Sequence, residues 1–355
     1  MIVVADLAGG PDLAELRRRC DASLAAFLDR QQLRWPDPSV FDTIRRFVLA
    51  GGKRLRPLFC YWGWRGAGGS DRPEIITAAA ALELFHAFAL IHDDIMDQSV
   101  RRRGAPSVHC ALAQAHRDQA RRGDAAAFGI NAALLCGDLC AAWADQMFAE
   151  SGLPTDAVRS GQHTFAAMRT ETIAGQYLDL RSAADHGSVA DALTVIRMKA
   201  ARYTVTRPLE IGAALTGAPE PVRAAYRAFG DPLGDAFQLR DDVLGVFGDP
   251  TVTGKPALDD LREGKRTVLL ALARLTADRA QAAVLDSLVG RPDLDEAGAA
   301  EVRAVIVATG ALDRTERMIR TRTRAARAAL ASAPVTPAAA EALTSLATSA
   351  VDRDR

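Results

Sequence analysis

The segment AAALELFHAFALIHDDIMD, residues 79–97, decides which fold this chain is predicted to have. It consists mainly of strong helix formers, contains neither proline nor glycine, and carries three carboxylates at its end, Asp93, Asp94 and Asp97. Residues four apart lie on the same face of a helix, so we expect Asp93 and Asp97 to point the same way. A bound cation would remove the repulsion between them. Magnesium fits best, because it binds carboxylate, water and phosphate oxygens.

A second acidic pair, Asp241-Asp242, occurs in a similarly apolar, helix-like segment. Two such clusters suggest a shared metal, and a magnesium ion held by few carboxylates predicts a phosphate-bearing ligand. The alternative is that each cluster is a solvated helix end with a chance run of acids. A lone DDxxD pattern does not decide between these interpretations, so the cations elsewhere in the chain must be weighed with it.

Helical periodicity extends over most of the 355 residues, and strand-like alternation is almost absent. Helices are predicted near residues 12–33, 38–50, 56–66, 73–97, 107–122, 125–150, 155–180, 188–215, 219–247 and 257–275, and further helices follow to residue 350. No glycine-rich nucleotide-binding pattern follows a strand, which argues against α/β folds. We therefore predict an all-α fold with a flexible tail over 1–10 and a single domain over 11–350, a helical bundle around a deep central substrate cavity.

Composition and charge limit the partners of the chain. Its 44 basic and 44 acidic residues cancel, so no overall field would attract nucleic acid or an anionic membrane. The five cysteines are scattered without zinc-type spacing, which is typical of reduced thiols in a cytoplasmic protein. The longest apolar stretch, residues 76–91, is interrupted by Glu83 and His86, so we expect no membrane span.

A basic segment, GGKRLRP at residues 51–57, has the composition of a diphosphate-binding turn. Its two glycines allow a close backbone approach, while Lys53 offers a point charge and Arg56 a bidentate fork to phosphate oxygens. The alternative is an ordinary basic turn at the surface.

Further cations and polar groups accompany the acidic clusters. The run Arg101–Arg103 follows Asp97. These arginines would either bind an anion that bridges them to the aspartates, or neutralise the aspartates as surface ion pairs. His86 lies two helical turns before Asp93, although a lone histidine on an apolar helix is often a core residue. The later members of this set are Lys199, Gln238, Lys255 and Lys265.

Two loops, residues 98–106 and 245–264, follow the acidic clusters and contain glycine, proline and cations. We predict that both act as mobile lids.

Several segments in this order, GGKRLRP, HAFALIHDDIMD, RRRG, GQYLDL, FQLRDD and GK…DLREGK, resemble the motifs of the trans-isoprenyl diphosphate synthases. The resemblance extends from Lys53 to Thr267, and as a set these motifs are highly specific. It implies a magnesium-dependent enzyme that condenses isopentenyl diphosphate head-to-tail with C5, C10 or C15 allylic diphosphates. It also implies a homodimer.

The resemblance implies a role for each matching residue. The metal ligands would be Asp93, Asp97 and Asp241, which would hold three magnesium ions, with Asp94 and Asp242 in support. The allylic diphosphate would be bound by Arg102, Lys199, Gln238 and Lys255, with Lys265 closing over it. Isopentenyl diphosphate would be bound by Gly52, Lys53, Arg56, His86 and Arg103.

The chain departs from the family pattern at two positions. Gly245 stands where the second DDxxD motif would end, and Ala200 follows Lys199 where threonine is common. We expect Asp241 to carry metal binding in the second cluster, and we expect the missing hydroxyl at Ala200 to cost little.

Product length is expected to depend on what blocks the growing tail below the first acids. Phe88 lies five residues before Asp93, about 7.5 Å along a helix that rises about 1.5 Å per residue, and Phe85 lies three residues further down. Ala89 is small, so the helical turn before Asp93 leaves space for the growing chain, and the aromatic rings of Phe88 and Phe85 form the floor of that space. Alternatively, both phenylalanines are ordinary core residues. The pattern resembles short-chain synthases that stop at C20. We therefore predict geranylgeranyl diphosphate as the product, with farnesyl diphosphate next.

Two rival functions stay open on the sequence. A terpene cyclase of the same fold would ionise its substrate but would need no isopentenyl site, and Lys53, Arg56, His86 and Arg103 argue against it. A non-catalytic partner subunit that tunes another synthase should have lost acids, whereas the first motif of this chain is whole.

Overall fold

The computed structural model describes residues 11–33, 38–182, 188–248 and 258–351. Its helices are α1 (Leu13–Gln32), α2 (Pro38–Leu49), α3 (Leu55–Gly66), α4 (Pro73–Met96), α5 (Val108–Asp118), α6 (Ala125–Ala149), α7 (Thr155–Ser182), α8 (Val189–Ile196), η1 (Arg197–Thr206), α9 (Arg207–Leu215), α10 (Glu220–Phe247), α12 (Asp259–Arg262), α13 (Val268–Thr276), α14 (Arg279–Leu288), α15 (Glu296–Ala308), α16 (Ala311–Ala331) and α17 (Pro337–Val351). Two short strands, β1 (Arg101–Arg102) and β2 (Ala105–Pro106), complete the described elements. The all-α prediction is confirmed.

The segment at residues 98–106, predicted as a mobile lid, contains a hairpin. Strands β1 and β2 pair antiparallel, with Arg102 opposite Ala105. Between them, Arg103 and Gly104 have φ angles of 52° and 77°, the left-handed pair that closes a tight two-residue turn. Strands of two residues are too short to show any alternation in the sequence, which is why the hairpin was not predicted.

Two predicted helices are interrupted in the structure. The segment at 188–215 changes from α8 to the wider π-helical turns of η1 before α9 begins. At Gly175 of α7 a Cβ atom would lie 2.3 Å from the backbone nitrogen of Lys199, so only glycine lets the η1 backbone come this close. The segment at 257–275 is divided into α12 and α13, because Gly264 adopts a left-handed φ of 68° between them.

The second predicted lid, residues 245–264, is also partly helical. Gly245 belongs to α10, and the end of the segment includes α12. Residues 249–257 lie outside the described ranges.

Contacts divide the chain into two compact units, which are described separately. One comprises Met1–His163 and Ile211–Ala218, and the other comprises Thr164–Glu210 and Pro219–Arg355. Two of the boundaries therefore fall inside α7 and α9, and the third lies between α9 and α10. A single domain over 11–350 stays a prediction.

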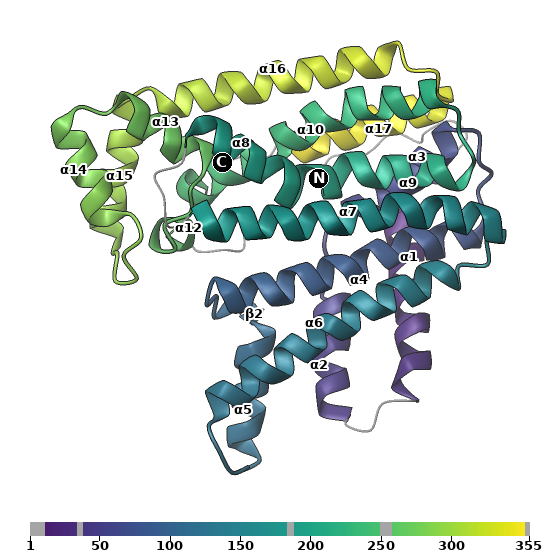
Figure 1. Ribbon diagram of the computed structural model, residues 1–355, viewed down its shortest axis with the longest axis horizontal. Coiled ribbons are helices and arrows are strands. Elements are labelled where there is room, and N and C mark those ends of the chain that lie inside the picture. The colour runs from purple at the N-terminus through teal and green to yellow at the C-terminus, as the bar shows by residue number, and fades with distance from the viewer. Residues whose placement is uncertain (1–10, 34–37, 183–187, 249–257, 352–355) are drawn as a thin grey trace. The chain divides into compact units, whose positions relative to one another are not determined.

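Helix α4 is central to the first unit, where it packs against α1, α3 and α6 (Figure 1). Its alanine run at residues 78–81 is fully buried and presents little bulk to its neighbours. Large aromatic side chains of α3, including Phe59 and Trp62, fill the core beside it. Helix α5 approaches α6 closely at Gly129, where a Cβ atom would lie 2.3 Å from the carbonyl oxygen of His109. This packing fixes the acidic end of α4 within its unit.

Helix α10 is central to the second unit, where it packs against η1 and α16 (Figure 1). At Gly234 a Cβ atom would lie 2.7 Å from the carbonyl oxygen of Ala201, so the two backbones are in close contact. At the next residue, the buried carboxylate of Asp235 pairs with Arg197 of η1 at 3.0 Å and with Arg322 of α16 at 3.2 Å. These ties hold the segment of α10 that leads to the second acidic pair.

Two helices among the described residues, α4 and α6, are long and apolar enough to cross a membrane by length and composition. In α4, 67% of the most apolar window is buried within the protein, as expected for a core helix. In α6 the buried share is only 28%, and Ile130, Leu134 and Leu135 are exposed on its surface. The apolar surface of α6 therefore needs a separate explanation.

Candidate active site

The first acidic cluster lies at the C-terminal end of α4. Asp93 and Asp94 occupy its last turn, and Asp97 is the C-cap residue. The buried carboxylate of Asp94 accepts hydrogen bonds from the guanidinium of Arg102 in β1, with Nε at 2.7 Å, and Arg102 Nη2 also reaches Asp93 at 3.5 Å. The hairpin thus brings Arg102 onto the acids, where it orients Asp94 and offsets part of the negative charge.

Four guanidinium groups lie around His86 on α4. Burial of the imidazole holds the pKa of His86 well below its usual value, and the positive charges of Arg56, Arg103, Arg102 and Arg54 lower it further. His86 is therefore neutral at neutral pH and can accept or donate one hydrogen bond without adding charge. So many cations in one place favour an anionic ligand.

The glycine turn lies against this group. Gly51 and Gly52 have positive φ angles of 83° and 133°, and Arg103 Nη1 donates to the Gly51 carbonyl at 3.0 Å. The Arg103 guanidinium comes within 3.6 Å of the place where a Cβ atom at Gly52 would stand. Lys53 is exposed, and its carbonyl accepts a hydrogen bond from Arg17 at 3.1 Å. The first unit thus gathers the predicted residues Gly52, Lys53, Arg56, His86 and Arg103.

Replacing His86 by glutamine should change how stability depends on pH. The unfolded histidine titrates near its ordinary pKa, whereas the folded pKa is lower, so the folded state loses stability as pH falls below about 6.5. Between pH 7.5 and 5.5 the wild-type protein should lose about 1 kcal/mol more than the variant. Urea unfolding at both values measures this difference. The exposed histidine His163, replaced in the same way, is the control, and equal pH slopes for wild type and His86→Gln would contradict the assignment.

Arg54 was not among the predicted site residues, yet it organises the glycine turn. It adopts a left-handed φ of 50° and is buried. Its guanidinium donates to Glu83 at 2.9 Å, to Asp21 at 2.8 Å and to the Val48 carbonyl at 2.9 Å. The sequence signal that could have pointed to Arg54 was Glu83, an acid inside an apolar helix, because a buried carboxylate needs a cationic partner.

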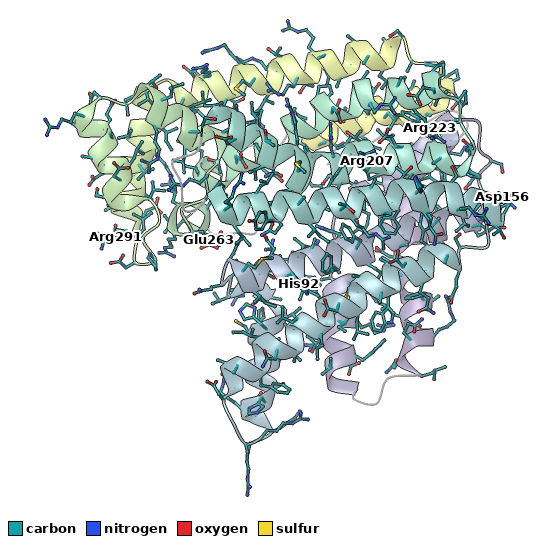
Figure 2. All side chains as sticks on the ribbon, in the orientation of Figure 1. His92, Asp156, Arg207, Arg223, Glu263 and Arg291 are labelled. Atoms are coloured by element: carbon teal, nitrogen blue, oxygen red, sulfur yellow. The ribbon has the colours of Figure 1, made fainter. Side chains whose placement is uncertain are left out.

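The aromatic side chains below the first acids form a stack. Phe88 lies 5.3 Å from Phe85 and 4.7 Å from the imidazole of His92, measured between ring centroids. The His92 ring Nε2 is 3.1 Å from the Leu134 carbonyl of α6, and a Cβ atom at Gly137 would lie 2.2 Å from the ring (Figure 2). His92 therefore fits into a notch in α6 and supports Phe88 from the side. Ala89 is partly exposed on the same helix.

The second acidic pair lies near the C-terminal end of α10. Gln238 Nε2 donates to Asp242 Oδ1 at 3.1 Å, whereas Asp242 Oδ2 has no hydrogen-bond partner among the described residues. Asp242 is 6% exposed, and burial raises its pKa to about 8; the hydrogen bond from Gln238 opposes this rise, Asp260 and Asp241 add to it, and Lys265 opposes it. A nearby cation would favour the ionised form of this carboxyl.

Lys199 lies in η1 and is held by an acid that was not predicted as a site residue. Its Nζ donates to Asp179 Oδ2 of α7 at 2.6 Å. Asp179 belongs to the GQYLDL segment, which contributed to the family resemblance without any assigned role. Ala200, the residue after Lys199, is part of the same π-helical segment.

Lys265 lies after α12 and contacts two acids. Its Nζ is 3.2 Å from Asp260 Oδ1 and 2.7 Å from Glu263 Oε2, on the turn labelled by Glu263 in Figure 2. The last predicted diphosphate ligand, Lys255, lies outside the described residues.

The residues present fit magnesium. Within the described ranges, no group of three or more His, Cys, Asp or Glu side chains is assembled to hold a metal by itself. Magnesium does not require such a group, because one or two carboxylates suffice when water and phosphate oxygens complete its shell. The buried Asp242 oxygen also gains a partner when a cation binds nearby.

An all-α chain with acids suited to magnesium and with arginines and lysines suited to diphosphate belongs to a class of metal-dependent enzymes that act on diphosphate esters. The sequence model of the polyprenyl synthetase family matches residues 38–306, most of the chain. The chain belongs to the polyprenyl synthetase family, and it is a prenyltransferase.

Similar proteins support this assignment. The chain is 34% identical over 304 residues to the geranylfarnesyl diphosphate synthase of Aeropyrum pernix, covering 84% of this chain and 89% of the relative. The crystal structure of a Corynebacterium glutamicum geranylgeranyl pyrophosphate synthase, complexed with isoprenyl diphosphate and magnesium, is 40% identical with a TM-score of 0.93 and covers 97% of this chain and 100% of that one. A Caulobacter crescentus polyprenyl synthase with calcium and isoprenyl diphosphate is 31% identical with a TM-score of 0.78, covering 96% of this chain and 98% of that one.

Proposed function

We propose that this prenyltransferase condenses isopentenyl diphosphate head-to-tail with C5, C10 and C15 allylic diphosphates, and that its main product is geranylgeranyl diphosphate. The observation that carries the proposal is the set of guanidinium groups around neutral His86, beside the open backbone at Gly51 and Gly52. These guanidinium groups suit the binding of a second diphosphate, in addition to the diphosphate that the aspartates would bind through magnesium. A terpene cyclase binds no isopentenyl diphosphate and would not need this second diphosphate site.

The acids are proposed as ligands for three magnesium ions. Asp93, Asp97 and Asp241 would bind them, and Asp94 and Asp242 would support these ligands. When bound, magnesium offsets the charge of the departing pyrophosphate and so favours ionisation of the allylic carbon–oxygen bond. The hydrogen bonds from Arg102 to Asp94 keep the end of α4 ordered for this task.

The cations divide between the two substrates in this proposal. The allylic diphosphate would be bound by Arg102, Lys199, Gln238, Lys255 and Lys265. Isopentenyl diphosphate would be bound by Gly52, Lys53, Arg56, His86 and Arg103. The double bond of the bound isopentenyl diphosphate attacks the allylic carbocation, and the proton then lost goes to the released pyrophosphate. Holding both substrates in place supplies much of the rate.

Phe88 is proposed to limit product length. Its ring is supported by Phe85 below and by His92 at the side, so it cannot turn away easily when the growing chain reaches it. Ala89 leaves the turn above it open. The named relatives make products of several lengths, so their names do not choose a product length for this chain. The aromatic floor formed by Phe88 and Phe85 is the feature that supports a C20 product.

Replacing Phe88 by alanine should lengthen the product. Loss of the ring opens space along α4, so we expect C25 and longer prenyl diphosphates to replace most of the C20 product. Mass spectrometry of the products made from farnesyl and isopentenyl diphosphates measures the change. Phe128→Ala, which removes an aromatic ring beside His116 in the same unit, is the matched control. An unchanged distribution in Phe88→Ala would show that the floor lies elsewhere.

Incubating the purified chain with magnesium, isopentenyl diphosphate and each allylic starter tests the proposed function. Elongated linear prenyl diphosphates are the expected products. Hydrocarbon formation without isopentenyl diphosphate would instead indicate a terpene cyclase. No turnover by the purified chain alone would favour the partner-subunit alternative.

A homodimer in the cytoplasm is also proposed. The exposed Ile130, Leu134 and Leu135 lie on one long face of α6, and a second copy of the chain would cover this apolar surface. All five cysteines are free, as in a reducing compartment. The mass of the purified protein in solution, measured by light scattering, tests the dimer.

A further inference from the structure

Helix α16 carries a row of exposed arginines that the proposed function does not use. Successive members of the row are three, three, four and three positions apart, a spacing that keeps them on one side of a helix. At about 1.5 Å per residue the row is about 20 Å long. We call it the arginine stripe, and its members are Arg314, Arg317, Arg320, Arg324 and Arg327.

The inner side of α16 fixes the stripe in place within the second unit. Ile319 and Ala326 are buried there. Two charged residues also face inward, and both are paired: Glu316 with Arg240 at 2.7 Å, and Arg322 with Asp235 at 3.2 Å. Figure 1 shows α16 running along the edge of this unit. The inner charges of the helix are therefore used in packing, whereas the arginine stripe faces solvent.

Few acids accompany the arginine stripe. Asp313 is the only exposed acid of α16, and Glu341 is the only acid of α17, which packs against it. No member of the stripe forms an ion pair within the part of the chain that the structure describes, and Arg327 Nη2 donates to the neutral Thr348 Oγ1 at 3.0 Å. The zero net charge of the chain thus coexists with a local excess of positive charge.

We propose that the arginine stripe docks this enzyme on membrane surfaces that contain anionic phospholipids. A straight row of guanidinium groups fits a flat array of phosphate head groups, each of which can accept paired hydrogen bonds from arginine. The activity of the enzyme favours this partner, because a prenyl diphosphate joins an apolar tail to an anionic head and so partitions into a bilayer. The inference goes beyond the proposed function and does not depend on product length.

Exposed apolar side chains near the start of α16 add to the argument. Leu275 at the end of α13 is 65% exposed, and Val307 near the end of α15 is 55% exposed. The ends of these two helices meet, because Thr276 Oγ1 donates to the Thr309 carbonyl at 3.1 Å. Helix α16 begins two residues after Thr309. Cations close to exposed apolar side chains are the combination that lets a segment bind to a membrane surface.

Replacing Arg317, Arg320 and Arg324 together by glutamine tests the inference. The probes are vesicles of phosphatidylglycerol and phosphatidylcholine in equal parts, sedimented with the full chain in the absence of substrate. Wild type should bind these vesicles but not vesicles of phosphatidylcholine alone, and about 0.5 M salt should release it. The triple variant should bind about a hundredfold more weakly, because each arginine near an anionic surface strengthens binding about fivefold.

Two further triple variants control for charge and for folding. Arg159, Arg279 and Arg291, exposed at scattered positions, become glutamine in the first, which has the same net charge as the stripe variant and should bind within about threefold of wild type. Lysine at the three stripe positions keeps the charge and should also keep the binding within about threefold. All three variants should retain wild-type prenyl transfer with substrates in solution, which shows that they fold.

Wild-type affinity of the glutamine stripe variant for the vesicles would overturn the inference. Absence of wild-type binding to the anionic vesicles would also overturn it, as would equal binding to vesicles of phosphatidylcholine alone. Stripe-dependent binding of double-stranded DNA without vesicle binding would identify a nucleic acid surface instead. Failure of the proposed function would appear separately, as absence of prenyl products from the wild-type chain, because the vesicle measurement needs no substrate.

Discussion

Replacing Asp93 by asparagine is expected to lower kcat for prenyl transfer by about a thousandfold. A ligand carboxylate lets magnesium supply several kcal/mol of charge stabilisation, and about 1.4 kcal/mol corresponds to a factor of ten in rate. Asparagine keeps the size of the side chain, and Arg102 still has Asp94 as its main partner, so α4 should remain folded. Initial rates with farnesyl and isopentenyl diphosphates at saturating magnesium measure the effect.

Asp29→Asn is the matched control for Asp93→Asn. Asp29 is an aspartate of the same unit whose side chain is 58% exposed and pairs with Arg45 at 2.9 Å. Exposed pairs of this kind contribute about 1 kcal/mol or less to stability, and the pair lies outside the proposed site. If Asp93→Asn kept more than a tenth of the wild-type kcat, Asp93 would not be a metal ligand in the rate-limiting step.

Replacing Arg54 by methionine is expected to destabilise the protein by about 3–5 kcal/mol, because it leaves the buried carboxylate of Glu83 without its cation. The side chains of Arg54 and Glu83 are 2% and 4% exposed and lie 2.9 Å apart. The glycine turn should also lose its order, so the KM for isopentenyl diphosphate should rise. Urea unfolding and steady-state kinetics measure the two effects.

Two variants separate this effect from a general loss of positive charge. Arg45→Met removes an exposed arginine and should cost about 1 kcal/mol or less. Arg54→Met combined with Glu83→Leu removes both members of the buried pair and should be more stable than Arg54→Met alone. If Arg54→Met proved no less stable than Arg45→Met, the buried pair would have no structural role.

Local patterns predicted much of this protein. The helix expected over 73–97 runs from Pro73 to Met96, because its apolar residues and helix formers act within a few turns of each other. The side chains of Arg102 and Asp94 meet as the motif spacing suggested, since the two residues are only eight positions apart. The roles of these residues in binding metal and diphosphate remain predictions.

Contacts between distant parts of the chain were not predicted. Arg54 meets Asp21 and Glu83 across 33 and 29 residues, and neither separation leaves a periodic signal. Asp179 holds Lys199 from another helix, 20 residues away. The tight two-residue hairpin and the π-helical turns of η1 depend on backbone geometry that composition does not reveal.

By itself the sequence determined the all-α class, the approximate boundaries of α1 to α7 and of α10, the two acidic clusters and the basic turn, because helix propensity and motif spacing act along the chain. Only the tertiary structure decided which charges meet. It placed Arg54 in a buried ion pair, Arg102 on Asp94, and Lys199 on Asp179. The physical reason is that a charge is stabilised by whatever packing brings within a few ångströms of it, wherever that partner lies in the sequence.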